Sequence, residues 1–174
     1  MKSVVAFIVA SLSCSAIAAE SRALLPLPPG WRTPTDVELE SEYSWRNSSP
    51  VKYLAVQGDF DGDHIPDIAR LLVSKSGHKY GLVISFGGRP FGQAHQLLES
   101  GPVGALSILG IDSSPAGSHN VICGDRSAGF DWCRPGEPTL LRQKTDGVAR
   151  FLEGKSAYVY YLRGRFFHKV WVSD

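Results

Sequence analysis

From residue 51 onward, apolar and polar residues alternate in short runs separated by glycine-, serine- and aspartate-bearing turns. A period of two over four to eight residues is typical of half-buried β-strands. Glycine-bearing hairpin turns are predicted at 145–147 and 163–164. We predict strands at 52–56, 68–73, 80–86, 105–111, 120–123, 139–143, 148–152, 157–162 and 165–172. The expected fold is mainly β, an antiparallel meander forming a barrel, a sandwich or an abbreviated propeller-like arrangement.

Residues 19–50 follow a different pattern and are expected to form an N-terminal arm and helix ahead of a single β domain at 51–174. The arm is proline-rich at 25–31, which favours an extended chain. Thr33 as cap, Pro34 in the first turn and Asp36 near the positive end of the helix dipole predict a helix running to about Trp45. A second, short helix is predicted at 93–98.

The first 18 residues have the three parts of a secretory signal peptide. Lys2 supplies the positive charge, residues 4–12 are apolar, and Ala16-Ile17-Ala18 fits a small-x-small cleavage site. The expected location is therefore periplasmic, or secreted. Lipidation at Cys14 is the less favoured alternative, because Ser11-Leu12-Ser13 makes a poor lipobox. The later segments are too short and too polar to span a bilayer, so no membrane span is expected.

The densest run of charge lies at 58–67, where four aspartates alternate with other residues around Gly62. Like charges this close repel, and a hard divalent cation that takes several oxygen ligands offsets the repulsion. The alternative is a solvated acidic turn, because Asp and Gly are ordinary turn residues. We favour a Ca²⁺ loop whose ligands are the side chains of Asp59, Asp61, Asp63 and Asp67 and the backbone carbonyl of Ile65.

The runs VQGDFDGD at 56–63 and PDIA at 66–69 resemble the calcium-loop repeat of FG-GAP and VCBS proteins. The resemblance implies a loop between two antiparallel strands of a propeller blade, in domains that mostly serve adhesion or partner binding. His64 replaces the glycine usual at the sixth position, where the backbone tends to be left-handed, and this predicts weakened affinity. The loop occurs once, which excludes a full propeller built from repeats.

Two cysteines, Cys123 and Cys133, remain after cleavage. In an oxidising compartment we expect them to form a disulfide. A metal or redox thiol pair is the alternative, and it lacks Cys-x-x-Cys spacing. Removing residues 1–18, which carry only Lys2, takes the formal net charge from +1 to zero. This balance gives no reason to expect a nucleic-acid partner.

Catalytic motifs are missing from the sequence: there is no Gly-x-Ser-x-Gly elbow, no His-Glu-x-x-His and no phosphate-binding glycine loop with a lysine. The run Asp59 to Gly62 resembles the first motif of aspartate-nucleophile phosphatases, which would make Asp59 the nucleophile and Asp61 the acid. However, Asp63 stands where that motif has a hydroxyl residue, and it would repel phosphate. We therefore do not expect an enzyme.

The predicted function is that of an exported, calcium-stabilised binding protein. In its size, expected location and metal loop, the chain resembles periplasmic inhibitors of lysozymes and antibacterial effectors, that is, immunity proteins. A carbohydrate- or surface-binding adhesive module is the alternative, and an uncharacterised hydrolase the third. Aromatic residues crowd the last hairpin at 157–172, where we expect one face to fill the core. The expected partner-binding residues have interface-type side chains on two glycine-rich loops: Arg89, Phe91, Arg126, Phe130 and Trp132.

Overall fold

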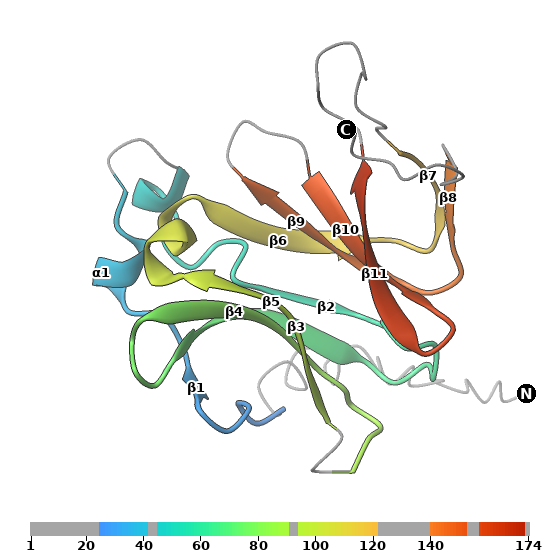
Figure 1. The fold of residues 1–174 in the computed structure, drawn as a ribbon, viewed down its shortest axis with the longest axis horizontal. Helices are drawn as coiled ribbons and strands as arrows, with labels where there is room; N and C mark the ends of the chain where they lie inside the picture. Colours follow the sequence, from blue (N-terminus) through green and yellow to red (C-terminus); the bar gives the residue numbers. More distant parts are fainter. Residues whose placement is uncertain (1–24, 42–44, 91–93, 122–139, 153–156, 173–174) are drawn as a thin grey trace, which may run out of the picture.

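The computed structural model describes residues 25–41, 45–90, 94–121, 140–152 and 157–172 (Figure 1). The predicted signal peptide at 1–18 and the predicted disulfide between Cys123 and Cys133 lie outside these residues. The described chain is mainly β, and its strands pair antiparallel. That confirms the mainly β, antiparallel part of the predicted fold class.

Within the described residues the first sheet has five strands, and a long hairpin forms its centre. The strand order is β1-β3-β4-β5, and β2 also pairs with β3. Strand β2 ends opposite the start of β3, with Gly58 paired to Asp67, so the predicted metal loop is the connection of a β-hairpin. The strands are β1 (Trp31–Arg32), β2 (Ala55–Gly58), β3 (Asp67–Ser74), β4 (Lys79–Ser85) and β5 (His95–Pro102).

In the part of the chain that the structure describes, a second sheet has four strands in the order β11-β10-β9-β6, and a third consists of β7 and β8. Figure 1 shows the second sheet lying across the first. The strands are β6 (Leu109–Ser114), β7 (Gly117–Asn120), β8 (Leu140–Gln143), β9 (Gly147–Leu152), β10 (Ala157–Arg163) and β11 (Phe166–Val172).

The main hydrophobic core lies between the first two sheets. Leu71 and Leu82 face it from one sheet, and Ile111, Val148 and Tyr160 face it from the other. In β3 the buried positions are continuous rather than alternating, because the second face of that strand is also covered. Of the three architectures expected, the described strands form a sandwich-like pair of sheets and do not close into a barrel.

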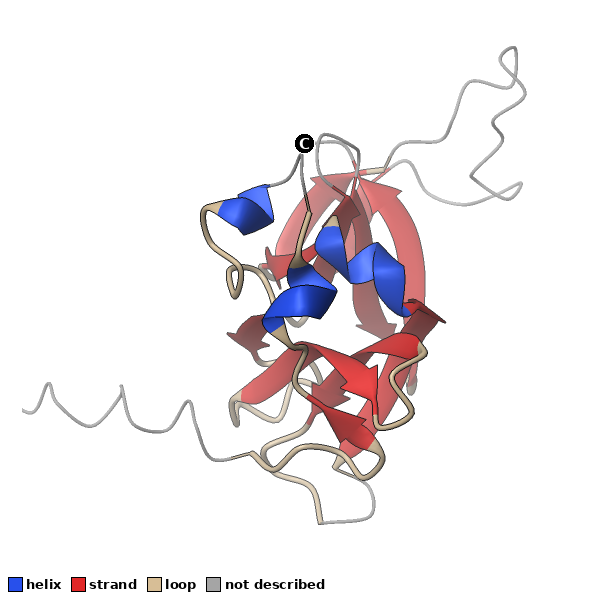
Figure 2. Ribbon diagram, turned by 90° about the vertical axis from the view of Figure 1, so that its left-hand side faces the viewer, coloured by secondary structure: helices blue, strands red, loops and turns tan. Residues whose placement is uncertain are grey.

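The helical predictions are largely wrong. The N-terminal helix α1 covers only Asp36–Leu39, and Glu40 is already extended at φ −63° and ψ 132°. Its apolar stripe is too thin to stabilise more turns. The cap is Thr35 rather than Thr33: the Glu38 carboxylate accepts a hydrogen bond from Thr35 N–H at 2.9 Å and pairs with Arg32 at 2.6 Å. Figure 2 shows the short helical pieces gathered on one side of the sheets.

The predicted helix at 93–98 is instead the start of strand β5. Pairing with β4 over seven positions decides its conformation, and tertiary pairing of this kind commonly overrides local propensity. The strand expected at 105–111 begins later: Val103–Ser107 form the 3₁₀-helix η3, and β6 follows at Leu109.

Residues 145–147 are not the hairpin turn that we predicted. Strand β8 pairs with β7 and strand β9 pairs with β6, so β8 and β9 run on in the same direction. Together the four strands form one long antiparallel ladder that is bent at 115–116 and 144–146. The Asp-Gly pair at 146–147 therefore marks a bend within a ladder.

A buried arginine ties the N-terminal region to the second sheet. Arg46 lies in the 3₁₀-helix η2 (Trp45–Asn47) and is 1% exposed. Its guanidinium donates hydrogen bonds to four backbone carbonyls, those of Pro50, Lys52, Leu106 and Leu109. Desolvation lowers the pKa of Arg46 to about 10.

Candidate metal centre

The acidic loop at 59–66 is anchored by one residue on each side of its bend. Phe60 is 0% exposed and belongs to the main core. Asp67, the first residue of β3, is also 0% exposed, and its Oδ2 accepts a hydrogen bond from Phe60 N–H at 2.9 Å. The loop is therefore held against the core before any ion is considered.

Asp67 is the most buried carboxylate of the site. Besides Phe60 N–H, it accepts a hydrogen bond from Gly87 N–H at 3.0 Å. The pKa of Asp67 is raised to about 6, mainly by burial and to a smaller extent by the charges of Asp61 and Asp63, which together outweigh the lowering effect of the two backbone donors. The protein's own groups therefore only partly offset the cost of a negative charge on Asp67.

Asp59 and Asp61 bring two more carboxylates to the same point. Oxygen atoms of Asp59, Asp61 and Asp67, one from each, lie within 4.8 Å of one another. Asp59 also organises the loop backbone, because it accepts hydrogen bonds from Gly62 N–H at 2.7 Å and His64 N–H at 3.2 Å. The structure therefore brings three of the four predicted acidic side chains together.

The group of three does not include the side chain of Asp63. One carboxylate oxygen of Asp63 accepts a hydrogen bond from Ile65 N–H at 2.8 Å. The Ile65 side chain is 45% exposed. Their assignment as ligands stays a prediction.

Two left-handed residues allow the loop to turn this tightly. Gly62 has φ +83° and His64 has φ +65°. The second value confirms the left-handed backbone expected at the sixth position, where histidine is strained and glycine is not. The His64 ring lies beside Asp59, with Nδ1 3.3 Å from Oδ2.

Residues 87–89 cover the loop and supply a cation. Arg89 donates from Nε and Nη2 to Asp61 Oδ2 at 3.0 and 2.8 Å, and its guanidinium lies 3.8 Å from the ring centroid of Phe86. A Cβ on Gly88 would stand 2.4 Å from Asp63 Oδ2, so a larger residue here would push the exposed Asp63 side chain aside. We predicted Arg89 as a partner-binding residue, but in this structure it pairs within the chain.

Asp146 is a further residue of the site, which sequence reasoning missed. Its carboxylate accepts hydrogen bonds from Asp59 N–H and Ala116 N–H, both at 3.1 Å, and its own N–H donates to the Asp59 carbonyl at 3.1 Å. It thereby joins the loop of the first sheet to the bend in the β6–β9 ladder. Its position before Gly147 suggested only a turn, so the sequence carried no signal for this role.

The other sequence predictions divide between described and undescribed residues. In the last hairpin Tyr160 is 5% exposed and fills the core as expected, whereas Phe166 is 72% exposed. No helix among the described residues is long and apolar enough to cross a membrane. The predicted site residues outside the described ranges are Cys123, Cys133, Phe91, Arg126, Phe130 and Trp132.

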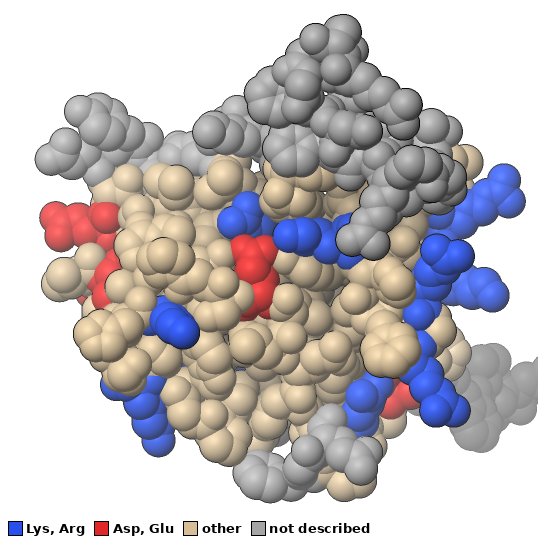
Figure 3. All heavy atoms as spheres, in the orientation of Figure 1, with Lys and Arg blue, Asp and Glu red and all other residues tan. Residues whose placement is uncertain are grey.

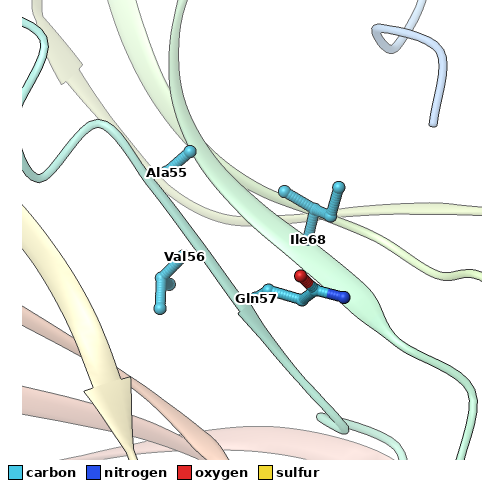
Figure 4. Close-up of a pocket in the computed structure, with 4 residues that line it drawn as sticks. All are labelled: Ala55, Val56, Gln57 and Ile68. Carbon is cyan, nitrogen blue, oxygen red and sulfur yellow. The ribbon is translucent and has the colours of Figure 1, made fainter. Parts of the chain in front are cut away.

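A hollow of about 340 Å³ lies beside strand β2 and is separate from the acidic loop. Figure 4 shows that three of the lining residues come from β2 and that Val56 is directed away from Ala55, Gln57 and Ile68. Among these four lining residues, only Gln57 offers a polar side chain.

Comparison of the chain with family models, with curated proteins and with solved structures finds no match. The resemblance to FG-GAP and VCBS loops therefore depends on the residues at 56–69 alone.

Proposed function

We propose that the chain is a calcium-stabilised β scaffold that is exported and binds a protein partner. The observation that carries the first part is the grouping of Asp59, Asp61 and Asp67 within 4.8 Å, with Asp67 fully buried. Carboxylate oxygens are the donors that a hard cation prefers, and Ca²⁺ accepts the irregular geometry of a short loop better than Mg²⁺ does.

The residues present fit such an ion. Asp59 and Asp67 have only neutral backbone N–H donors and the exposed His64 ring as described partners. Arg89 neutralises one carboxylate, that of Asp61, which leaves an excess of negative charge at the loop. We infer that Ca²⁺ adds the missing positive charge while Arg89 remains at the rim.

The binding role follows from what the ion would hold in place. Through Asp61, Arg89 and the close packing at Gly88, the loop positions residues 87–89 at the surface. Arginine beside an aromatic ring is a frequent anchor of protein interfaces. A preformed surface loses less entropy on association than a flexible one. We therefore favour an inhibitor or immunity protein whose contact surface includes Arg89.

The adhesive alternative has less support from the last hairpin. A sugar-binding platform needs exposed, parallel aromatic rings, whereas Tyr158 and Trp171 lie at 38° to each other with centroids 3.5 Å apart. Lys169 Nζ already lies 4.4 Å from the Tyr158 ring centroid. This pair packs within the sheet and leaves no flat face between its rings.

The test of the metal centre is thermal unfolding in Ca²⁺ and in excess chelator. We expect Ca²⁺ to raise the Tm by mass action, and we expect Asp61→Asn to remove most of that rise. Asp112→Asn is the matched control, because Asp112 is exposed on β6 and its carboxylate accepts only the N–H of Ser113. A Ca²⁺ response that is equal in both variants would contradict the assignment.

The test of the partner role is affinity capture from periplasmic and competitor-effector extracts, performed in Ca²⁺ and in chelator. We expect one protein to be retained in Ca²⁺ and to be lost with Arg89→Ala. Lys75→Ala, in the exposed turn after β3, serves as the control. Retention that is unaffected by Arg89→Ala would exclude this surface.

A further inference from the structure

A second cluster of charged side chains lies between the two sheets, far along the chain from the acidic loop. It begins with a β-bulge in β5, where the register with β4 shifts so that Leu97 pairs with Val83 while Glu99 pairs with Leu82. The extra residue, Leu98, reverses the alternation of the strand. Glu99 is thereby turned to the same face as Leu82, which belongs to the core between the sheets.

Glu99 is fully engaged there. Tyr80 and Tyr160 each donate a phenolic hydrogen bond to its carboxylate, and Arg150 Nη2 lies 3.2 Å from Oε1. These partners come from β4, β10 and β9, so the network connects both sheets. Two phenolic donors and one ion pair therefore hold the Glu99 carboxylate, and the charge of Lys169 acts on it only from a longer distance.

Lys169 on β11 nevertheless lies beside this network. Its Nζ is 4.4 Å from the ring centroid of Tyr158 and 6.0 Å from that of Tyr160. Among the described residues, no carboxylate forms an ion pair with Lys169. Arg150 also keeps a buried Nε without a hydrogen-bond acceptor. The cluster therefore has two cations, Arg150 and Lys169, and one carboxylate, Glu99. Figure 3 shows acidic atoms between basic ones near the middle of the face that it draws.

An open cleft of about 280 Å³ leads to Lys169. One wall is β5, which pairs only with β4 among the described strands, so its outer edge presents unpaired backbone groups. The other wall is formed by β10 and β11. The lining residues are Gln96, Leu97, Leu98, Glu99, Tyr160, Phe167 and Lys169.

We propose that this cleft binds the free α-carboxylate end of a short peptide with an apolar last residue. Lys169 would pair with the carboxylate, and its position next to an already neutralised Glu99 gives the site a net positive charge. The open edge of β5 would bind the backbone amides, as sheet edges do in strand addition. Leu98 and Phe167 would receive the apolar side chain. The small volume accommodates the last one or two residues, and any residues before them would lie along the edge of β5 outside the cleft.

The experiment is a calorimetric titration of the full mature chain with N-acetyl-L-leucine and with the acetylated tripeptide Ala-Ala-Leu. Each is compared with its C-terminal amide, which has the same shape and no charge. We expect the carboxylate forms to bind at least tenfold tighter than the amides. If the tripeptide binds more tightly than N-acetyl-L-leucine, the natural ligand is the end of a polypeptide. If the two bind equally, the natural ligand is a free acylated amino acid.

Two variants separate the site from general charge effects. Lys169→Met keeps most of the unbranched side chain without its charge and should remove the preference for carboxylate, whereas Lys75→Met should leave it unchanged. Circular dichroism checks that both variants fold. Equal affinity for carboxylate and amide in the unaltered protein would overturn the proposal, and so would tighter binding of glucuronate than of either peptide acid. The titration in chelator separates this proposal from the calcium site, which lies on other residues.

Discussion

Asp67 gives the sharpest test of the metal centre, because its burial has a calculable cost. Its pKa of about 6, against an ordinary value of 3.8, means that ionising it in the folded protein costs about 3 kcal/mol at pH 7 in the absence of an ion. Asp67→Asn removes that cost. The variant also loses one hydrogen-bond acceptor, because the amide oxygen of Asn replaces only one of the two carboxylate oxygens that accept from Phe60 N–H and Gly87 N–H. That loss should lower the unfolding free energy by about 1 kcal/mol.

The direction of the pH dependence follows from the raised pKa. Between about pH 4 and pH 6 the folded protein binds the Asp67 proton more tightly than the unfolded chain does. Stability from this group therefore falls as the pH rises through that window. In chelator, lowering the pH from 7 to 5 should recover about 1.3 kcal/mol of the cost. In Ca²⁺ the trend should reverse, because protons then compete with the ion for the carboxylate.

The assay is urea unfolding followed by tryptophan fluorescence, with the unaltered protein and Asp67→Asn measured side by side at pH 5 and pH 7. Subtracting the unfolding free energy of the variant from that of the unaltered protein cancels the titration of other groups. One of these is His95, whose pKa is lowered by burial. We expect the difference in unfolding free energy to change by about 1 kcal/mol in chelator and in the opposite direction in Ca²⁺. A difference that is flat with pH in chelator would refute the reasoning.

Three further predictions concern other parts of the chain. Arg46→Met should lower the unfolding free energy in urea by about 3 kcal/mol or more, because it leaves buried carbonyls without donors, whereas Arg32→Met, which removes a surface ion pair, should cost much less. His64→Gly should raise the Tm and the Ca²⁺ affinity, since relief of roughly 1–2 kcal/mol of left-handed strain exceeds the roughly 0.5–1 kcal/mol entropic cost of glycine; an unchanged Ca²⁺ titration would contradict this. Glu99→Gln should lower stability by about 2 kcal/mol above pH 5. Because the Glu99 pKa is lowered, that loss should shrink as the unaltered protein is taken to lower pH, and a pH-independent loss would argue against an ionised Glu99.

The parts of the fold that were predictable are those set by neighbouring residues. Strands β3 and β4 alternate or run apolar between clear turns, and their hairpin was predicted to within one residue at each end. The acidic loop was visible because its residues are contiguous, and the left-handed His64 followed from the loop pattern. The group of Asp59, Asp61 and Asp67 at one point is a consequence of the same short segment.

The parts that failed depend on contacts between distant residues. The local pattern predicts a helix at 93–98, and only pairing with β4 makes the residues from His95 onward a strand. The bend at 144–146 looked like a hairpin because Asp-Gly pairs favour one. Its real geometry requires β7 and β6 as partners along the whole ladder. Neither partner is visible from the local pattern.

Asp146 lies far from the acidic loop in the sequence but contacts it in the structure, and this contact explains where the loop lies. A calcium loop that only closed the β2–β3 hairpin would stabilise one edge of one sheet. Here Asp146 bonds to the Asp59 backbone in both directions and to Ala116, so the loop lies where the first sheet meets the bent ladder of the second. Ordering the loop therefore orders the junction of the sandwich. An ion bound by Asp59 would act on both sheets at once, which a solvated acidic turn at an outer hairpin would not require.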